Sequence, residues 1–485
     1  MPIGPIQLIR QATPGQRRTL LAASLGWMLD SFDAMLYALV LTHVMRDLGM
    51  TKSTAGLLST LMLLASGIGG ILFGFLADRI GRKRALLLSI LTYSLCSFAS
   101  GLSTSILMLA IFRFILGLGM GGEWNTGATL VAETWPDDLR AKALSIVQSS
   151  WAIGFALAAL VAGIVLRYAN WRMVFFIGIL PALVTLWIQN KVPESEMWLE
   201  HERDTNREPR SKQSALRSSG KSSSLPAPEL VSNICLGKGT ASAVPPSAAT
   251  DEALAAEGRP PHPRSQQTLR LNDSPQSNAP SGNSFFCIFR PPYLKSTAAL
   301  LFLNLFGLFG WWGLFQWIPA YLSLPIARGG RGFSVLDTTS LLVVLNLFGM
   351  FPGYLSFGWV ADRLGRRRSF ILYLLAAAFL IPLYAVARSP AAMLVLGAIV
   401  AFFATGWFSG CSVIASEIYP TSLRARALGF TYTGARAMSS VAPFVIGRVG
   451  DLKGLTWAFY LCAAAFLLAS AMATQLPETK GRSLE

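Results

Sequence analysis

Charged residues and histidines are scarce in this sequence of 485 residues. Asp, Glu, Lys and Arg together make up 14% of the chain, whereas 53% of the residues are hydrophobic and the mean hydropathy is +0.48. This composition indicates an integral membrane protein rather than a soluble one. The three histidines, His43, His201 and His262, lie away from the centres of the apolar segments. Proton transfer at membrane depth would therefore have to use carboxylates.

Motifs of several pump and enzyme classes are also missing. The sequence contains no nucleotide-binding P-loop, which argues against a primary pump. It shows neither a catalytic nucleophile paired with a base nor a group of metal ligands. We therefore expect no enzyme activity, no metal and no cofactor. The five cysteines show no disulfide or metal spacing. Residues 1–18 are polar and basic, and the apolar run after them is too long for a cleavable signal peptide.

A duplicated pattern runs through most of the chain. The stretch Gly74–Arg84 returns 284 residues later, almost unchanged, as Gly358–Arg368. Such a shared register predicts two halves related as a parallel repeat. Further pairs at the same offset are Glu133 with Glu417, Leu139 with Leu423, Glu194 with Glu478 and Trp27 with Trp311.

About twelve apolar segments are long enough to cross a hydrocarbon core of about 30 Å. The sequence therefore predicts an all-α membrane protein with twelve transmembrane helices in two six-helix halves. The expected spans are 19–44, 55–77, 85–103, 106–134, 143–167 and 172–190 in the first half, and 296–322, 338–361, 369–387, 392–418, 427–449 and 455–476 in the second.

The basic residues that give the formal net charge of +16 gather in short loops beside the apolar segments. This is the positive-inside pattern, so it indicates a membrane orientation rather than nucleic-acid binding. We expect a multi-pass protein of a bacterial inner membrane with both termini in the cytoplasm. The predicted regions are a cytoplasmic N-terminus at 1–18, a six-helix bundle at 19–190, a cytoplasmic linker at 191–295, a second bundle at 296–476 and a cytoplasmic C-terminus at 477–485. Its Ser-, Pro- and Arg-rich composition predicts that the linker is largely disordered.

The duplicated stretches resemble the signature that the major facilitator superfamily carries between helices 2 and 3 and between helices 8 and 9. The run from Arg113 to Glu123, with glycines at 117, 119, 121 and 122, is similar to the helix 4 signature of that superfamily. Asp30-Ser31-Phe32-Asp33 resembles an element of the sialate- or lactate-type and aromatic-acid proton symporters, with Ser31 in place of the usual Gly. The resemblance implies the superfamily fold and transport by alternating access.

Ionisable groups at membrane depth cost at least about 2.5 kcal/mol on insertion scales, so they are candidates for function. Asp30 and Asp33 are three residues apart and share one face of the first span. Burial and mutual repulsion disfavour their ionisation, so we expect at least one to hold a proton near neutral pH. Together with Glu123 they are the predicted proton-coupling groups; the alternative is a structural pair, and for Asp30 the two readings are balanced.

The buried cations are the candidates for binding an anion. A guanidinium offers a bidentate fork to a carboxylate, and we expect Arg436, with Tyr432 one turn before it, to bind substrate. Arg113 is predicted either to bind substrate or to pair with an acid of the first span. Gln316 and Trp312 are weaker candidates, since aromatic stripes more often serve packing.

Acids and arginines at the ends of the expected spans form a second candidate set. Charge-assisted pairs among them would bias the conformational equilibrium if they form only while the cytoplasmic ends are together. The alternative is that they are only positive-inside charges. The predicted cytoplasmic gate consists of Asp78, Arg79, Arg82, Glu133, Arg140, Glu194, Asp362, Arg363, Arg366, Glu417, Arg424 and Glu478.

These features predict a proton-coupled symporter of a small organic anion: a monocarboxylate, a sugar acid or an aromatic acid. Its partners would be protons, the substrate and the lipid bilayer, with no nucleic acid, and one chain would function as a monomer. The Pro-Glu-Ser and Pro-Glu-Thr endings at 193–195 and 477–479 leave a neutral sugar or polyol porter as an alternative. A proton-antiporting drug exporter and a transporter-like sensor also stay open.

Overall fold

The computed structural model describes residues 12–195, 198–199 and 285–480, and every regular element that these residues form is a helix. The described residues belong to one compact unit. Most of the expected linker, from residue 200 to residue 284, lies outside the described residues, so its predicted disorder stays a prediction.

The first half is built from helices of 7 to 34 residues joined by short turns. They are α2 (Pro14–Asp47), α3 (Lys52–Ile80), α4 (Arg82–Ser100), α5 (Ile106–Thr134), α6 (Asp137–Tyr168), α7 (Trp171–Ile177) and α8 (Pro181–Lys191).

The second half has more interruptions, including two π-helical turns, η3 and η4. Its elements are η1 (Phe285–Phe289), α10 (Leu294–Ser323), η2 (Ile326–Arg328), α11 (Val335–Val344), η3 (Leu345–Met350), α12 (Phe351–Leu364), α13 (Arg366–Val386), α14 (Pro390–Gly406), α15 (Phe408–Ile418), α16 (Thr421–Leu428), η4 (Gly429–Gly434), α17 (Ala435–Ser439), α18 (Ala442–Lys453) and α19 (Leu455–Ala473).

Ten stretches of the described residues are long and apolar enough to cross a membrane. Two of the twelve expected spans are not among them, although helix occupies both. At 85–103, α4 begins with three basic residues and contains four serines, which lowers its hydropathy. At 427–449 the chain is divided among α16, η4, α17 and α18. Pro443 stands in the first turn of α18, where its missing N–H costs little.

The duplicated stretches fold alike. Gly81 ends α3 with φ +97°, and Gly365 ends α12 with φ +95°. A residue with a side chain adopts such positive φ values at a cost, which explains a glycine at both positions. The turn lets α4 and α13 start directly after the preceding helices.

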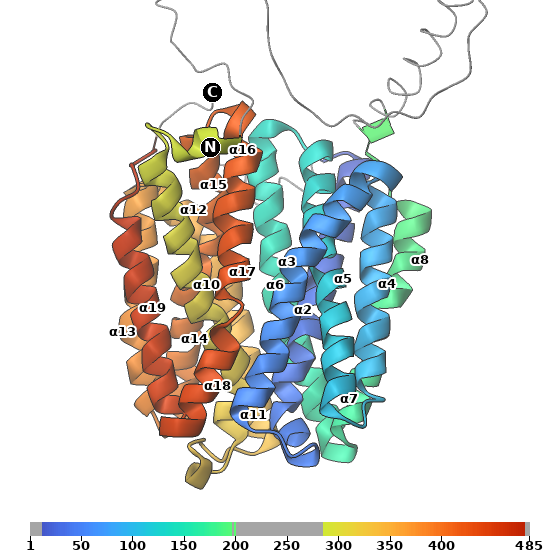
Figure 1. Cartoon of the computed structure of the whole chain (residues 1–485), viewed down its shortest axis with the longest axis vertical. Coiled ribbons are helices and arrows are strands. Elements are labelled where there is room, and N and C mark those ends of the chain that lie inside the picture. The colour runs from blue at the N-terminus through green and yellow to red at the C-terminus, as the bar shows by residue number, and fades with distance from the viewer. Residues whose placement is uncertain (1–11, 196–197, 200–284, 481–485) are drawn as a thin grey trace, which may run out of the picture. The chain divides into compact units, whose positions relative to one another are not determined.

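Helices of the two halves stand side by side, the first half blue to green and the second half yellow to red in Figure 1. The halves meet where α3 packs against α18, α6 against α11 and α12, and α2 against α10. We call the end that carries Arg82 and Arg366 the basic end, and the end where α3 begins and α18 finishes the opposite end. At the opposite end the halves are in direct contact, since Lys52 and Asp451 are hydrogen-bonded.

Candidate functional site

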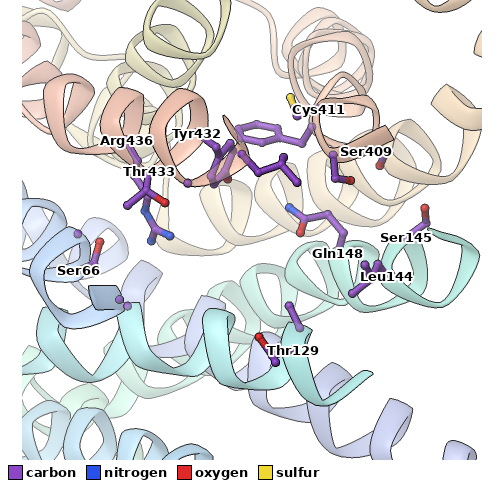
Figure 2. A pocket seen from close by; sticks show the side chains of 18 residues that line it. Ser66, Thr129, Leu144, Ser145, Gln148, Ser409, Cys411, Tyr432, Thr433 and Arg436 are labelled. Carbon is purple, nitrogen blue, oxygen red and sulfur yellow. The ribbon is translucent and has the colours of Figure 1, made fainter. Parts of the chain in front are cut away.

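A cavity of about 450 Å³ lies between the two halves. It is lined mostly by small and polar side chains, from α3, α5 and α6 of the first half and from α15, α16, η4 and α17 of the second. Among the described lining residues, Arg436 alone is charged. Figure 2 shows Arg436 and Tyr432 on one side of the cavity and Gln148 and Thr129 on the other. The cavity therefore has the size and polarity of a small-molecule site.

Arg436 is held by the irregular helix that precedes it. Tyr432 and Thr433 lie in the π-helical turn η4, and Arg436 follows in α17, so all three line the cavity. The Arg436 side chain is buried, with 8% of its surface exposed, and its Nε has no hydrogen-bond partner among the described residues. A buried guanidinium with an unpaired N–H group binds an anion strongly. Of the five residues predicted to bind substrate, Arg436 and Tyr432 line the cavity, and Trp312 lines a recess beside it.

Tryptophans form one wall of a recess beside Arg436. The rings of Trp27 and Trp151 are 4.7 Å apart, and those of Trp311 and Trp312 are 4.9 Å apart. Trp151 joins the two pairs, at 6.1 Å from each of Trp311 and Trp312. All four line the recess with Arg436. The recess has a volume of only about 20 Å³, room for about one water molecule, so the tryptophan rings pack against one another.

Sequence reasoning missed Gln148 and Trp151, which line the recess from α6. A signal for Gln148 was present, because the offset of 284 pairs it with Tyr432. Gln316 lies elsewhere: it is buried in α10, and neither atom of its amide has a hydrogen-bond partner among the described residues. It does not line the cavity or the recess.

The predicted proton-coupling acids are buried in the first half. Asp33 accepts a hydrogen bond of 2.9 Å from the hydroxyl of Ser97. Glu123 packs against Gly26, where a Cβ would overlap its carboxyl group. When ionised, Asp30 repels the carboxylate of Glu123 and attracts Arg436 of the other half. A buried carboxyl group of the first half is thus electrostatically coupled to the cavity's cation.

Each of these three acids has one oxygen without a partner among the described residues: Oδ2 of Asp30, Oδ2 of Asp33 and Oε2 of Glu123. A buried carboxylate with an unpaired oxygen is costly, whereas a carboxylic acid is much less so. The arrangement is therefore suited to groups that gain and lose a proton.

Arg113 takes a different position from Arg436. Its guanidinium lies over the ring of Tyr37, 4.7 Å from the ring centroid, and donates to the Ala34 carbonyl at 3.4 Å. Its nearest acid electrostatically is Asp33. Arg113 does not line the cavity, so the geometry favours its predicted pairing with an acid of α2 over substrate binding.

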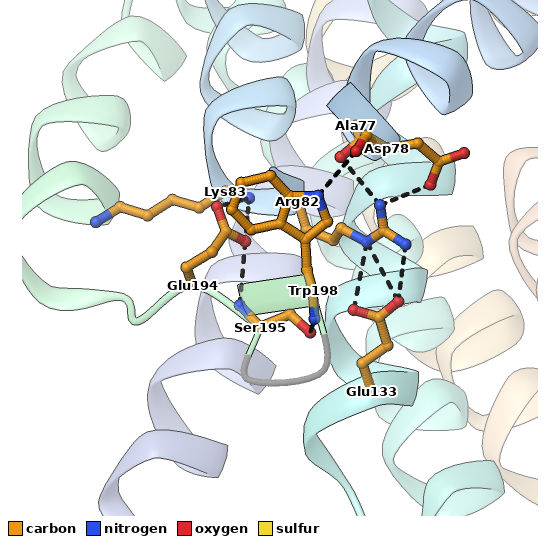
Figure 3. Close-up of polar contacts among 8 residues, drawn as sticks. All are labelled: Ala77, Asp78, Arg82, Lys83, Glu133, Glu194, Ser195 and Trp198. Carbon is orange, nitrogen blue, oxygen red and sulfur yellow. Dashed lines mark hydrogen bonds and ion pairs between the residues drawn. The ribbon is translucent and has the colours of Figure 1, made fainter. Parts of the chain in front are cut away.

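The duplicated clusters at the basic end have the same geometry in both halves. Arg82 pairs with Asp78 at 2.7 Å and with Glu133 at 3.1 Å, as Figure 3 shows. In the second half the distances from Arg366 are 2.8 Å to Asp362 and 3.0 Å to Glu417.

The acids after the last helix of each half complete these clusters. Glu194 accepts from the backbone N–H of Lys83 at 3.0 Å, and Glu478 accepts from that of Arg366 at 2.8 Å. Arg363 stacks over Trp359 at 4.4 Å. All of these contacts lie within one half, so they tie helices of a half together, and their part in a gate between the halves stays a prediction. Arg79, Arg140 and Arg424 lie in α3, α6 and α16 beside the clusters.

The comparisons with known proteins agree with this architecture. The family model of the Major Facilitator Superfamily matches residues 23–334 and 330–483. The chain belongs to the major facilitator superfamily. It is a multi-pass membrane transporter and not an enzyme.

Two relatives indicate the branch of the superfamily. The chain is 40% identical over 191 residues to the sialic acid transporter NanX of Escherichia coli, a match that covers 39% of this chain and 47% of NanX. It is 29% identical over 491 residues to a protein of Cupriavidus pinatubonensis named a probable 4-methylmuconolactone transporter, with 98% of this chain and 94% of that protein covered. These names agree with the expected metabolite–proton symporter group.

Among solved structures, the xylose transporter XylE from E. coli in a partially occluded inward-open conformation has a TM-score of 0.67. The match covers 97% of this chain and all of XylE, at 16% identity. It supports the two-repeat fold of this superfamily member, whose cavity lies between the repeats.

Proposed function

We propose that this transporter carries a small ring-containing organic anion together with a proton, by alternating access. The observation that carries the proposal is the position of Arg436, the charged residue of a cavity otherwise lined by small, polar and aromatic side chains. A carboxylate on the substrate pairs with the guanidinium, and the ring lies in the cavity of about 450 Å³ beside Tyr432 and Phe408.

Proton coupling follows from competition for Arg436. While Asp30 is ionised, its charge attracts the guanidinium of Arg436. When Asp30 gains a proton, this attraction is lost and the guanidinium is free to pair with the substrate carboxylate. Glu123 and Asp33 flank Asp30 and exchange the proton with it. Because proton and anion enter together, binding of each strengthens binding of the other.

The orientation follows the positive-inside pattern, with the basic end in the cytoplasm of a bacterium. The regions at 19–190 and 296–476 are the two moving bundles, joined by the cytoplasmic linker at 191–295. Both bundles belong to one chain, so a monomer is sufficient for transport.

A neutral sugar or polyol porter is the main alternative. It has no need of a buried guanidinium in its cavity, and Arg436 therefore favours an anion. A proton-antiporting drug exporter needs an acid facing a large apolar cavity, whereas the acids here do not line the cavity.

The decisive experiment is transport in proteoliposomes with a lumenal pH dye and an inward proton gradient. Pulses of benzoate, sialic acid, lactate and xylose are compared with protein-free vesicles, because weak acids also cross as neutral species. We expect acidification driven by a ring-containing acid. Uptake of labelled xylose without proton movement would contradict both the anion and the coupling.

Substrate exchange separates the role of Arg436 in substrate binding from the role of Asp30 in proton coupling. Exchange at equal pH on both sides needs binding and turnover but no net proton flux. We expect Asp30→Asn to keep exchange and to lose proton-driven uptake, and Arg436→Gln to lose both. If Asp30→Asn retains proton-driven accumulation, the proposed coupling site is wrong.

A further inference from the structure

The first turn of α3 is capped by a residue of the other half. Asp451, near the end of α18, accepts hydrogen bonds from the backbone N–H groups of Lys52 at 3.2 Å and Ser53 at 2.8 Å. The Ser53 hydroxyl donates to the same carboxylate, and Lys52 Nζ donates to the Gly450 carbonyl at 3.1 Å. First-turn N–H groups have no partner within their own helix, and the N-terminus of a helix attracts negative charge.

This cap lies where the backbones of α3 and α18 cross in direct contact. A Cβ at Gly447 would overlap the carbonyl oxygen of Lys52, and a Cβ at Gly56 would overlap that of Pro443. Both positions therefore require glycine for α3 and α18 to approach this closely. The crossing fixes the register in which Asp451 meets the start of α3.

The repeat supplies a second crossing at the opposite end. The offset of 284 pairs Gly447 with Gly163, and a Cβ at Gly163 would overlap the side chain of Thr339. Gly163 lies in α6 and Thr339 in α11, so α6 crosses α11 as α18 crosses α3. The two crossings are related by the duplication.

Only the crossing of α3 with α18 carries a carboxylate from the other half, as far as the described residues go. The residue that corresponds to Asp451 is Arg167, whose guanidinium lies 5.7 Å from the ring centroid of Tyr168. The first turn of α3 contains no acid, whereas the first turn of α11 contains Asp337. The backbone N–H of Asp337 donates to the side chain of the N-cap residue Ser334 at 3.1 Å. Thus α11 supplies its own acid, whereas α3 has the neutral N-cap Thr51, which accepts from the Thr54 N–H at 3.1 Å, and receives its carboxylate from the other half.

We propose that Asp451 is a latch that holds the opposite end of the transporter closed, and that the closure is asymmetric. The α3–α18 crossing is latched by the carboxylate, and the α6–α11 crossing is held by packing alone. Opening of this end breaks the bonds of Asp451 to Lys52 and Ser53. The inference does not depend on the identity of the substrate or on proton coupling.

Distance measurements between spin labels test the latch. The labels are attached at Thr104→Cys and Arg388→Cys, two exposed positions at the opposite end in different halves, after Cys96, Cys235, Cys287, Cys411 and Cys462 are replaced by Ser. In Asp451→Ala we expect the ratio of closed to open populations to fall by about threefold to thirtyfold, as for loss of a helix cap with charge.

Two further variants make the result specific. Arg167→Ala changes the matched position of the other crossing and is expected to behave as the parent. Asp451→Asn keeps the shape of the side chain and an oxygen acceptor, so we expect a smaller shift in the same direction, and it replaces Asp451→Ala if that variant does not fold. Unchanged populations in the folded Asp451 variants, or an equal shift in Arg167→Ala, would overturn the latch.

Discussion

At the scale of single residues, the two buried arginines differ in what surrounds them. Arg436 lines the cavity and has Asp30 as its electrostatic partner across the halves. Arg113 is enclosed within the first half against Tyr37 and Ala34. Equal charge and similar burial therefore lead to different expected roles.

Substitution of the two arginines should separate these roles. We expect Arg436→Gln to lower uptake at subsaturating substrate by about 30-fold or more, because removal of one partner of a buried charge pair costs about 2 kcal/mol or more. Arg113→Gln should lower the melting temperature of the purified protein instead. Initial rates of uptake and melting curves of both variants give the comparison, and an unchanged rate in Arg436→Gln would exclude it from the substrate site.

Glu478 gives a pH dependence of stability. Partial burial opposes its ionisation, but the N–H groups of Arg366, Lys480 and Thr479 outweigh this and hold the pKa of its carboxyl below the usual value. A lowered folded-state pKa contributes stability above the unfolded pKa of about 4.3, and that stability is lost as the pH falls through the folded pKa. The melting temperatures of the parent and Glu478→Gln should differ at pH 7 and converge on acidification; a difference that does not change with pH would contradict this.

At the scale of elements, the duplicated clusters join three helices in each half. Arg82 starts α4 and contacts α3 through Asp78 and α5 through Glu133. The π-helical turn η4 has no counterpart in the first half, where the corresponding part of α6 is a regular helix. π-Helical turns occur frequently at functional sites, and η4 carries Tyr432 and Thr433 into the cavity.

Because the two clusters have the same geometry, the matching substitution in each should lower the free energy of unfolding by a similar amount. Glu133 and Glu417 are both mostly buried, with 15% and 9% of their side chains exposed. We expect Glu133→Gln and Glu417→Gln each to lower stability by about 1.5–3 kcal/mol, the range for hydrogen bonds to a charged group. Melting curves in detergent measure this. A loss in one variant only would mean that the halves use their clusters differently.

At the scale of the whole molecule, the halves touch at the opposite end and the cavity extends towards the basic end. Lining residues such as Thr129 and Leu144 lie near the basic ends of α5 and α6. In this state substrate reaches the cavity from the basic end, which we propose faces the cytoplasm because of the positive-inside pattern.

Accessibility measurements should detect this state. Ser145→Cys, in a background without other cysteines, places a thiol in the cavity. We expect a membrane-impermeant thiol reagent to modify it faster from the basic end than from the opposite end, and a transported acid to slow the reaction. Arg388→Cys is the control. Its thiol is exposed at the opposite end, so it should react faster from that end than from the basic end. Equal rates from both sides would contradict the closure.

The sequence by itself determined the class of protein, its two halves and the set of buried ionisable residues. Apolar length and the 284-residue offset are properties of the chain alone, so they predict membrane helices and a repeat without knowledge of packing. They also place Asp30 and Asp33 on one helix face, because helical periodicity is local.

Only the tertiary structure decided which neighbours these residues meet. Arg436 and Arg113 are both buried cations in sequence, but the packing of η4 and α17 puts Arg436 in the cavity, and the packing of α5 against α2 and α3 encloses Arg113. Asp451 and Lys52 lie almost 400 residues apart, and their contact depends on how the two halves cross. Periodicity specifies the face of a helix but not the helix that covers it, since that choice is made by packing between distant segments.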